Sequence, residues 1–144
     1  MSADEKPNRV DDLAFYQHLR SRLEHEDRLI VERMAWLMAS ESFLFTGYAI
    51  VLNGTGTPAQ RRLTDLMPLV GIGTSALILF GIVAAIRAMG WIPGQLRARI
   101  PDVARLGLPP IQAPGLLKAE LAAPLLLPVM FVVVWIYVLA AGPR

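Results

Sequence analysis

One acidic residue inside an apolar stretch has the clearest chemical meaning in this sequence. Glu41 lies within the apolar run 34–52, between Ser40 and Ser42. A carboxylate inside a bilayer is costly, so such a residue usually faces a protein interior, a water-filled cavity or a charged partner. Glu41 could relay protons or cations, or it could form a structural pair with Arg87 or hydrogen bonds to Ser and Thr hydroxyls. We favour a structural role, because a single acid makes a poor proton pathway.

Other residue types that support catalysis or cofactor binding are missing or badly spaced. The chain has no cysteine, which excludes disulfides, thiolate metal sites and iron–sulfur clusters. Its two histidines, His18 and His25, are seven residues apart in a charged segment, a poor spacing for a metal pair on one helix. No phosphate-binding, nucleophile-elbow or zinc-protease motif occurs, nor a basic stripe with interleaved aromatics. We therefore expect no enzyme activity, cofactor, metal ion or nucleic-acid partner.

Three apolar runs must position Glu41. The 144-residue chain is 54% hydrophobic and 18% charged, which is more apolar than a usual soluble domain. The runs 34–52, 67–89 and 121–141 each approach the roughly 20 residues needed to cross a bilayer, where only a helix satisfies its own backbone. The sequence therefore predicts an all-α integral membrane protein with three transmembrane helices and a long charged N-terminal helix that continues into the first. The alternative, a soluble bundle, is disfavoured by the uniformly apolar second and third runs.

Basic residues set the predicted orientation and the division of the chain. Segments 1–33 and 90–120 together hold ten Lys and Arg residues, against three in the short connection and the C-terminal tail. The positive-inside rule then places the N-terminus and the long loop in the cytoplasm and the C-terminus outside. We predict a charged cytoplasmic extension over 1–33, a membrane domain over 34–141 with a Pro-rich cytoplasmic loop over 90–120, and an external tail over 142–144.

The charged extension carries an apolar seam of near-heptad spacing. Its members are Tyr16, Leu19, Leu23 and Ile30. Pairs of opposite charge four residues apart, such as Arg20 and Glu24, support a helix here by about 0.2–0.5 kcal/mol each. The seam could dock on a partner or a second copy, or the helix could lie on the protein's own cytoplasmic loop.

Small residues recur along the first two runs, which predicts close packing of their backbones in an antiparallel hairpin. The first stripe is Ala35, Ala39, Ser42, Thr46 and Ala49, and the second run offers Gly71, Thr74, Ser75, Gly81, Ala84 and Ala88. We accordingly expect Gly81→Leu to disrupt the hairpin by forcing the two backbones apart. The third run is bulky and β-branched, with Pro124 and Pro128 near its start, so we expect it to face lipid or another subunit.

The Pro-rich loop carries three arginines that could meet anionic lipid headgroups. These are Arg97, Arg99 and Arg105. Four apolar residues between and beside them could dip into the membrane surface: Leu96, Ile100, Val103 and Leu106. A short helix is expected over 101–106, since Pro101 suits a first turn. The alternative is a strap that docks on a neighbouring subunit.

The segment HEDRLIVERMAWLMASESFLFTGY, residues 25–48, resembles a pattern in small uncharacterised bacterial membrane proteins. That pattern has an EDxL motif, an arginine, a WL pair and then SFLF. Its residues here are Glu26, Asp27, Leu29, Arg33, Trp36, Leu37 and 42–45. Where the pattern has glutamine before SFLF, this chain has Glu41. The resemblance implies a location in the bacterial inner membrane and carries no known activity.

Together these observations predict a non-catalytic accessory or scaffold subunit of a larger bacterial membrane complex, for example an electron-transfer, respiratory or photosynthetic one. It would stabilise the complex through helix packing and its cytoplasmic extension. The expected partners are the lipid bilayer and other membrane subunits or copies of itself. The alternative is a homo-oligomeric ion channel or proton pathway in which Glu41 from several copies lines a pore.

Overall fold

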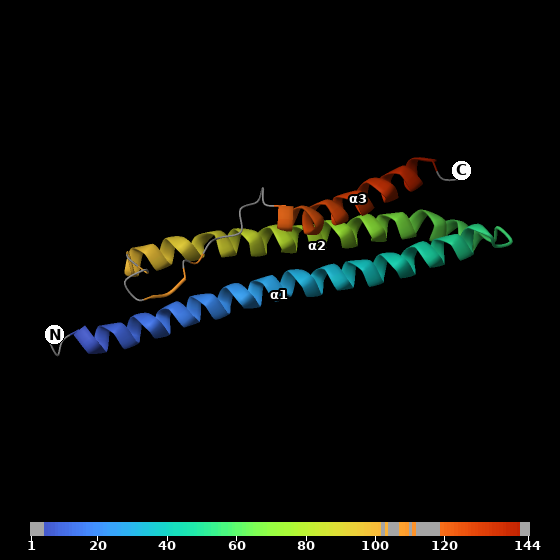
Figure 1. Ribbon diagram of the computed structural model, residues 1–144. Coiled ribbons are helices and arrows are strands. Elements are labelled where there is room, and N and C mark those ends of the chain that lie inside the picture. Colours follow the sequence, from blue (N-terminus) through green and yellow to red (C-terminus); the bar gives the residue numbers. More distant parts are fainter. Residues whose placement is uncertain (1–4, 102, 104–106, 110, 112–118, 142–144) are drawn as a thin grey trace.

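A computed structural model describes residues 5–101, 103, 107–109, 111 and 119–141 (Figure 1). They form three helices, α1 (Glu5–Leu52), α2 (Pro58–Arg99) and α3 (Ala119–Ala141). α1 and α2 run antiparallel, and α3 lies along the half of α2 nearest the connecting turn (Figure 1). All three are long and apolar enough to cross a membrane. The predicted all-α fold with three candidate membrane spans is confirmed.

The first two helices are much longer than a bilayer is thick. At 1.5 Å per residue the 48 residues of α1 extend about 72 Å, and the 42 residues of α2 about 63 Å. No glycine or proline interrupts α1 between Pro7 and Gly47. α2 starts at a capping box, in which the Thr57 side chain accepts from the Gln60 backbone N–H and the Gln60 side chain accepts from the Thr57 N–H.

The start of the predicted Pro-rich loop is helical instead. α2 continues through Pro93 to Arg99, although proline removes a backbone donor from a helix interior. Packing explains this difference, because Ile92 and Leu96 are buried against α1. Of the short helix expected over 101–106, residues 102 and 104–106, which include Arg105 and Leu106, lie outside the described residues.

We call the two-helix part formed by α1 residues 5–33 and α2 residues 87–99 the stalk. Its apolar seam is covered by the chain itself. One buried cluster joins Tyr16 and Leu19 of α1 to α2 and the residues after it, and a second joins Ile30 to α2, with Leu23 packed against both. These seam residues are therefore not free to dock on a partner. The alternative, a helix lying on the chain's own loop 90–120, holds for Tyr16 and Leu19, whereas Ile30 packs on the second apolar run.

Polar contacts also join α1 to the end of α2 and to the residues after it. The Tyr16 hydroxyl donates to the Pro109 carbonyl at 2.8 Å. The Arg99 guanidinium lies 4.5 Å from the centre of the Phe15 ring and 3.8 Å from Asp12. Arg99 thus contacts α1 where a lipid headgroup was expected, and Leu96 and Ile100 pack against α1 and not into a membrane surface.

Exposed ion pairs run along α1 within the stalk. Arg20 contacts Glu24 at 3.1 Å and Arg28 contacts Glu32 at 3.2 Å, as the four-residue spacing predicts. The hydrogen bond to Glu24 and the neighbouring Tyr16 raise the pKa of Arg20 above its ordinary value. Such exposed pairs add little stability, so the buried apolar seam holds the stalk together.

Candidate functional site

Glu41 lies where all three helices meet. Its side chain is only 1% exposed. One carboxylate oxygen accepts a hydrogen bond from the Ser75 hydroxyl of α2 at 2.7 Å, and the other accepts from the Trp135 indole N–H of α3 at 2.6 Å. The single acid of the apolar runs therefore links α1 to both other helices, and each of its oxygens has its own donor.

Trp135 fills the space beside Glu41 and is completely buried. Its indole stacks on Phe45, with ring centres 4.3 Å apart and planes 9° from parallel. Tyr48 meets the same indole edge-on at 5.8 Å. On its other side the indole lies against Gly71 of α2, where a Cβ atom would collide with the ring. The indole is thus held between α1 and α2 on both faces and by its N–H.

Arg87 is not the partner of Glu41. It is exposed, and among the described residues it makes no ion pair. Arg87 follows Ser75 by twelve residues on α2, so it lies about 18 Å further along the helix than the residue that contacts Glu41. The predicted ion pair is wrong, and the alternative of a hydroxyl hydrogen bond is what the structure has.

The serines beside Glu41 do not take part in the site. The Ser40 hydroxyl donates to the Leu37 carbonyl at 3.0 Å and the Ser42 hydroxyl to the Met38 carbonyl at 2.7 Å. Both bonds stay within α1, which is the usual way for a serine hydroxyl to be satisfied in an apolar helix. The serine that contacts Glu41 is Ser75, from the other helix of the hairpin.

The antiparallel hairpin of α1 and α2 is confirmed, but its interface is not the predicted one. The whole stripe proposed for α1 is exposed: Ala35, Ala39, Ser42, Thr46 and Ala49. On α2, Gly71 and Ser75 are buried, Thr74 and Gly81 are half-buried, and Ala84 and Ala88 are exposed. α1 instead buries larger side chains, including Leu37 and Tyr48, which fill the interior of the bundle.

Gly81 has a different role from the one predicted. Its carbonyl accepts a hydrogen bond from Arg33 at 2.9 Å, and a Cβ atom added at Gly81 would lie 3.4 Å from the Arg33 side chain. A larger residue there meets a flexible side chain, not the backbone of α1. The stated reason for a Gly81→Leu defect, that two backbones are forced apart, is therefore wrong.

The most important partner of Glu41 was not identified from the sequence. α3 was expected to face lipid or another subunit, whereas Trp135 turns into the bundle and Phe131 lies near Phe45. The one available signal was a tryptophan well inside an apolar run, away from the membrane interface that tryptophan prefers. Other bulky side chains of α3, such as Val133, Ile136 and Tyr137, are exposed. This agrees with the expectation of a helix that faces lipid or another subunit.

This arrangement suits a structural carboxylate. Buried polar groups are stable when every donor and acceptor is paired, and none of the buried side-chain nitrogen or oxygen atoms in the described residues lacks a partner. In the same part of the chain no group of three or more histidine, aspartate or glutamate residues could hold a metal ion. Both His18 and His25 are exposed on the stalk.

Comparisons with protein families, with curated proteins and with solved structures find no match for this chain. The resemblance of residues 25–48 to small bacterial membrane proteins therefore stays a prediction. The function has to be argued from the residues and their contacts.

The two donors around Glu41 lead to a graded prediction. In Glu41→Gln the amide oxygen can accept from Trp135, and the amide N–H can donate to the Ser75 hydroxyl, which also accepts. In Glu41→Leu both donors lose their acceptor, at about 1–3 kcal/mol for each buried unsatisfied group. We expect unfolding in mixed detergent to show Glu41→Gln within about 1 kcal/mol of the parent and Glu41→Leu clearly less stable. Equal stability of the two variants would contradict the assigned hydrogen bonds.

Proposed function

We propose that this protein is a non-catalytic scaffold subunit of a bacterial inner-membrane complex, anchored by its three helices and projecting the stalk into the cytoplasm. The observation that carries the proposal is an exposed tryptophan on the α2 part of the stalk, whose other large apolar side chains are buried. Trp91 is 75% exposed, although Met89 and Ile92 on either side of it are buried against α1. Tryptophan is enriched at the centres of protein interfaces, among the few residues that supply most of the binding energy of the interface.

The position of Trp91 favours a protein partner over lipid. Ile86 packs with Ile30, so Trp91 lies level with about residue 25 of α1, deep in the charged part of that helix. If α1 follows the membrane normal, the level of residue 25 lies about 12 Å beyond Arg33, which directly precedes the apolar run 34–52. The headgroup layer is only about 5–7 Å thick on each side of the hydrocarbon core. Measured along α1, Trp91 therefore lies beyond the headgroups, whereas along α2 it lies only two residues after the apolar run 67–89. Crosslinking at position 91 distinguishes a protein contact from a lipid contact.

The burial of Glu41 disfavours the channel alternative. A pore formed by several copies needs a polar side chain that faces the neighbouring copy, whereas Glu41 is enclosed by its own α2 and α3. An unpaired polar group along an exposed face would have supported ion conduction. The scaffold role needs no such group.

Site-specific photo-crosslinking in intact cells tests this proposal. A photoreactive residue at position 91 should give a discrete crosslink to a foreign subunit of a membrane complex. The matched control is position 80, where Phe80 is equally exposed but lies within the apolar run and should crosslink to lipid. Trp91→Ala should release the partner during purification in mild detergent without changing the unfolding midpoint.

Two results would overturn the scaffold role. One is a ring of identical chains with no foreign subunit in native mass spectrometry. The other is ion flux in liposomes that Glu41→Gln abolishes, because such flux would assign Glu41 to a conducting pathway.

A further inference from the structure

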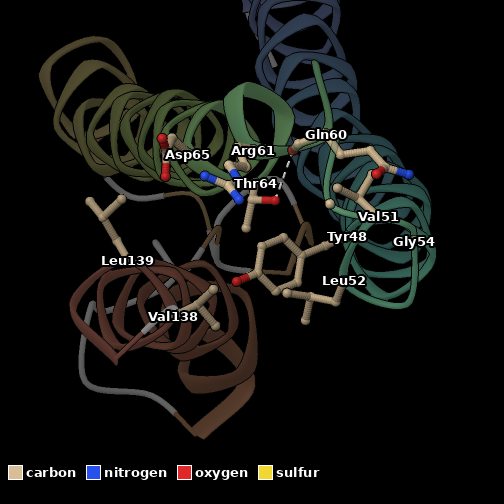
Figure 2. Close-up of a pocket in the computed structure, with 11 residues that line it drawn as sticks. Tyr48, Val51, Leu52, Gly54, Gln60, Arg61, Thr64, Asp65, Val138 and Leu139 are labelled. Carbon is tan, nitrogen blue, oxygen red and sulfur yellow. Dashed lines mark hydrogen bonds between the residues drawn. The ribbon is translucent and has the colours of Figure 1, made fainter. Parts of the chain in front are cut away.

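A pocket of about 610 Å³ opens at the end of the bundle where α1 leads into α2, and all three helices line it (Figure 2). It lies at the opposite end of the bundle from the stalk (Figure 1). Its volume falls within the roughly 300–1,000 Å³ of small-molecule sites. The connection between α1 and α2 lies between the apolar runs 34–52 and 67–89. This places the pocket at a membrane–water boundary.

The lining has an apolar side and a polar side. Leu52 of α1 and Val138 and Leu139 of α3 supply aliphatic surface, and the first turns of α2 supply Arg61 and Asp65. The Tyr48 ring projects from α1 into the space between the helices, with its hydroxyl directed toward Val138 (Figure 2). A ligand that fits must therefore be amphipathic, with its polar end at α2.

The polar side offers both signs of charge. Arg61 and Asp65 are one helical turn apart, yet neither makes an ion pair with any residue that the structure describes. The Arg20–Glu24 and Arg28–Glu32 pairs show that the same spacing is used for ion pairs elsewhere in the chain. Two unengaged opposite charges at the mouth of one pocket favour a ligand that carries both charges over a simple anion or cation.

We infer that this pocket binds the headgroup of a zwitterionic glycerophospholipid of the phosphatidylethanolamine type. The phosphate lies at Arg61, which suits bidentate recognition of phosphate oxygens, and the primary ammonium lies at Asp65. The first acyl carbons lie against Val138, Leu139 and Leu52. An anionic headgroup such as phosphatidylglycerol leaves Asp65 without a partner and is repelled by it.

Native mass spectrometry of the delipidated protein, titrated with single lipids, tests this inference. We expect phosphatidylethanolamine to bind more tightly than phosphatidylglycerol or phosphatidylcholine, whose quaternary ammonium cannot donate a hydrogen bond. Arg61→Gln should weaken binding at least about tenfold, because it removes the charge-assisted hydrogen bonds to the phosphate. Asp65→Asn should weaken phosphatidylethanolamine alone and leave phosphatidylglycerol unchanged or tighter. The matched control is Arg62→Gln, an exposed neighbour outside the pocket, which should bind like the parent.

Binding of soluble glycerophosphoethanolamine distinguishes a lipid site from a site for a free phosphate compound. The soluble compound should bind far more weakly than the lipid, because it lacks the acyl carbons that contact α3. Equal binding of the soluble compound would overturn the lipid assignment. Unchanged lipid binding by both Arg61→Gln and Asp65→Asn, with circular dichroism showing both folded, would overturn the site itself.

Discussion

Trp135→Ala is expected to destabilise the protein by about 3–5 kcal/mol, the usual cost of removing a large buried aromatic side chain. The indole contacts Phe45 and Tyr48 of α1 and lies against Gly71 of α2, so its loss opens a cavity at the centre of the bundle. It also leaves one oxygen of Glu41 without its donor. Reversible unfolding in mixed detergent, followed by circular dichroism, measures the change.

Trp36→Ala is the matched control for that experiment. Trp36 lies in the apolar run 34–52 of α1 but is 73% exposed, so its removal opens no cavity inside the bundle. We expect its unfolding midpoint to stay close to that of the parent. If the two tryptophan variants lost equal stability, Trp135 would not hold α3 against the hairpin.

Gly71→Val is the second substitution with a large expected effect. A Cβ atom at Gly71 would collide with the Trp135 ring. The indole cannot move aside easily, because Phe45 stacks on it and its N–H is bonded to Glu41. Overpacking of this kind costs about 1–3 kcal/mol when a core can adjust and more when it cannot. We expect Gly71→Val to displace α3 and to expose Trp135, which a red shift of its fluorescence would report.

Gly73→Val provides the control on the same helix. A Cβ atom at Gly73 meets no heavy atom of other residues within 4 Å, so valine there adds bulk to an open surface. Its stability and fluorescence should match those of the parent. Equal behaviour of Gly71→Val and Gly73→Val would contradict the close approach of α2 to Trp135.

The three helices, the hairpin and the burial of Glu41 inside the protein could be predicted from the sequence, because each depends on local signals. Apolar run lengths define the spans, and one acid in an apolar run is conspicuous wherever it lies. The donors to Glu41 are 34 and 94 residues away along the chain, so no local pattern identifies them. Arg87 was the wrong choice because charge was matched without knowing the register of α1 against α2.

The small-residue stripes failed for a related reason. Two small residues four apart permit close helix contact but do not require it. On α1 the rotation of the helix is set by Leu37, Glu41 and Tyr48, whose burial turns Ala35 and Ala39 outward. On α2, Gly71 and Ser75 do lie at a helix interface. They contact the side chains of Trp135 and Glu41 there, and not the small residues predicted on α1. Only the three-dimensional register distinguishes the two cases.

The continuity of α1 has a mechanical consequence. About 43 Å of this helix extends before residue 34, and no glycine or proline lies between Pro7 and Gly47 to absorb a bend. α2 is braced along the same length by the Tyr16 and Ile30 clusters. A change of about 10° in inclination at the bilayer therefore displaces the distal tip sideways by about 7 Å. With its candidate spans anchored in a bilayer, the helical pair would act as a lever, so that a small tilt of the spans would move the distal tip by several ångströms.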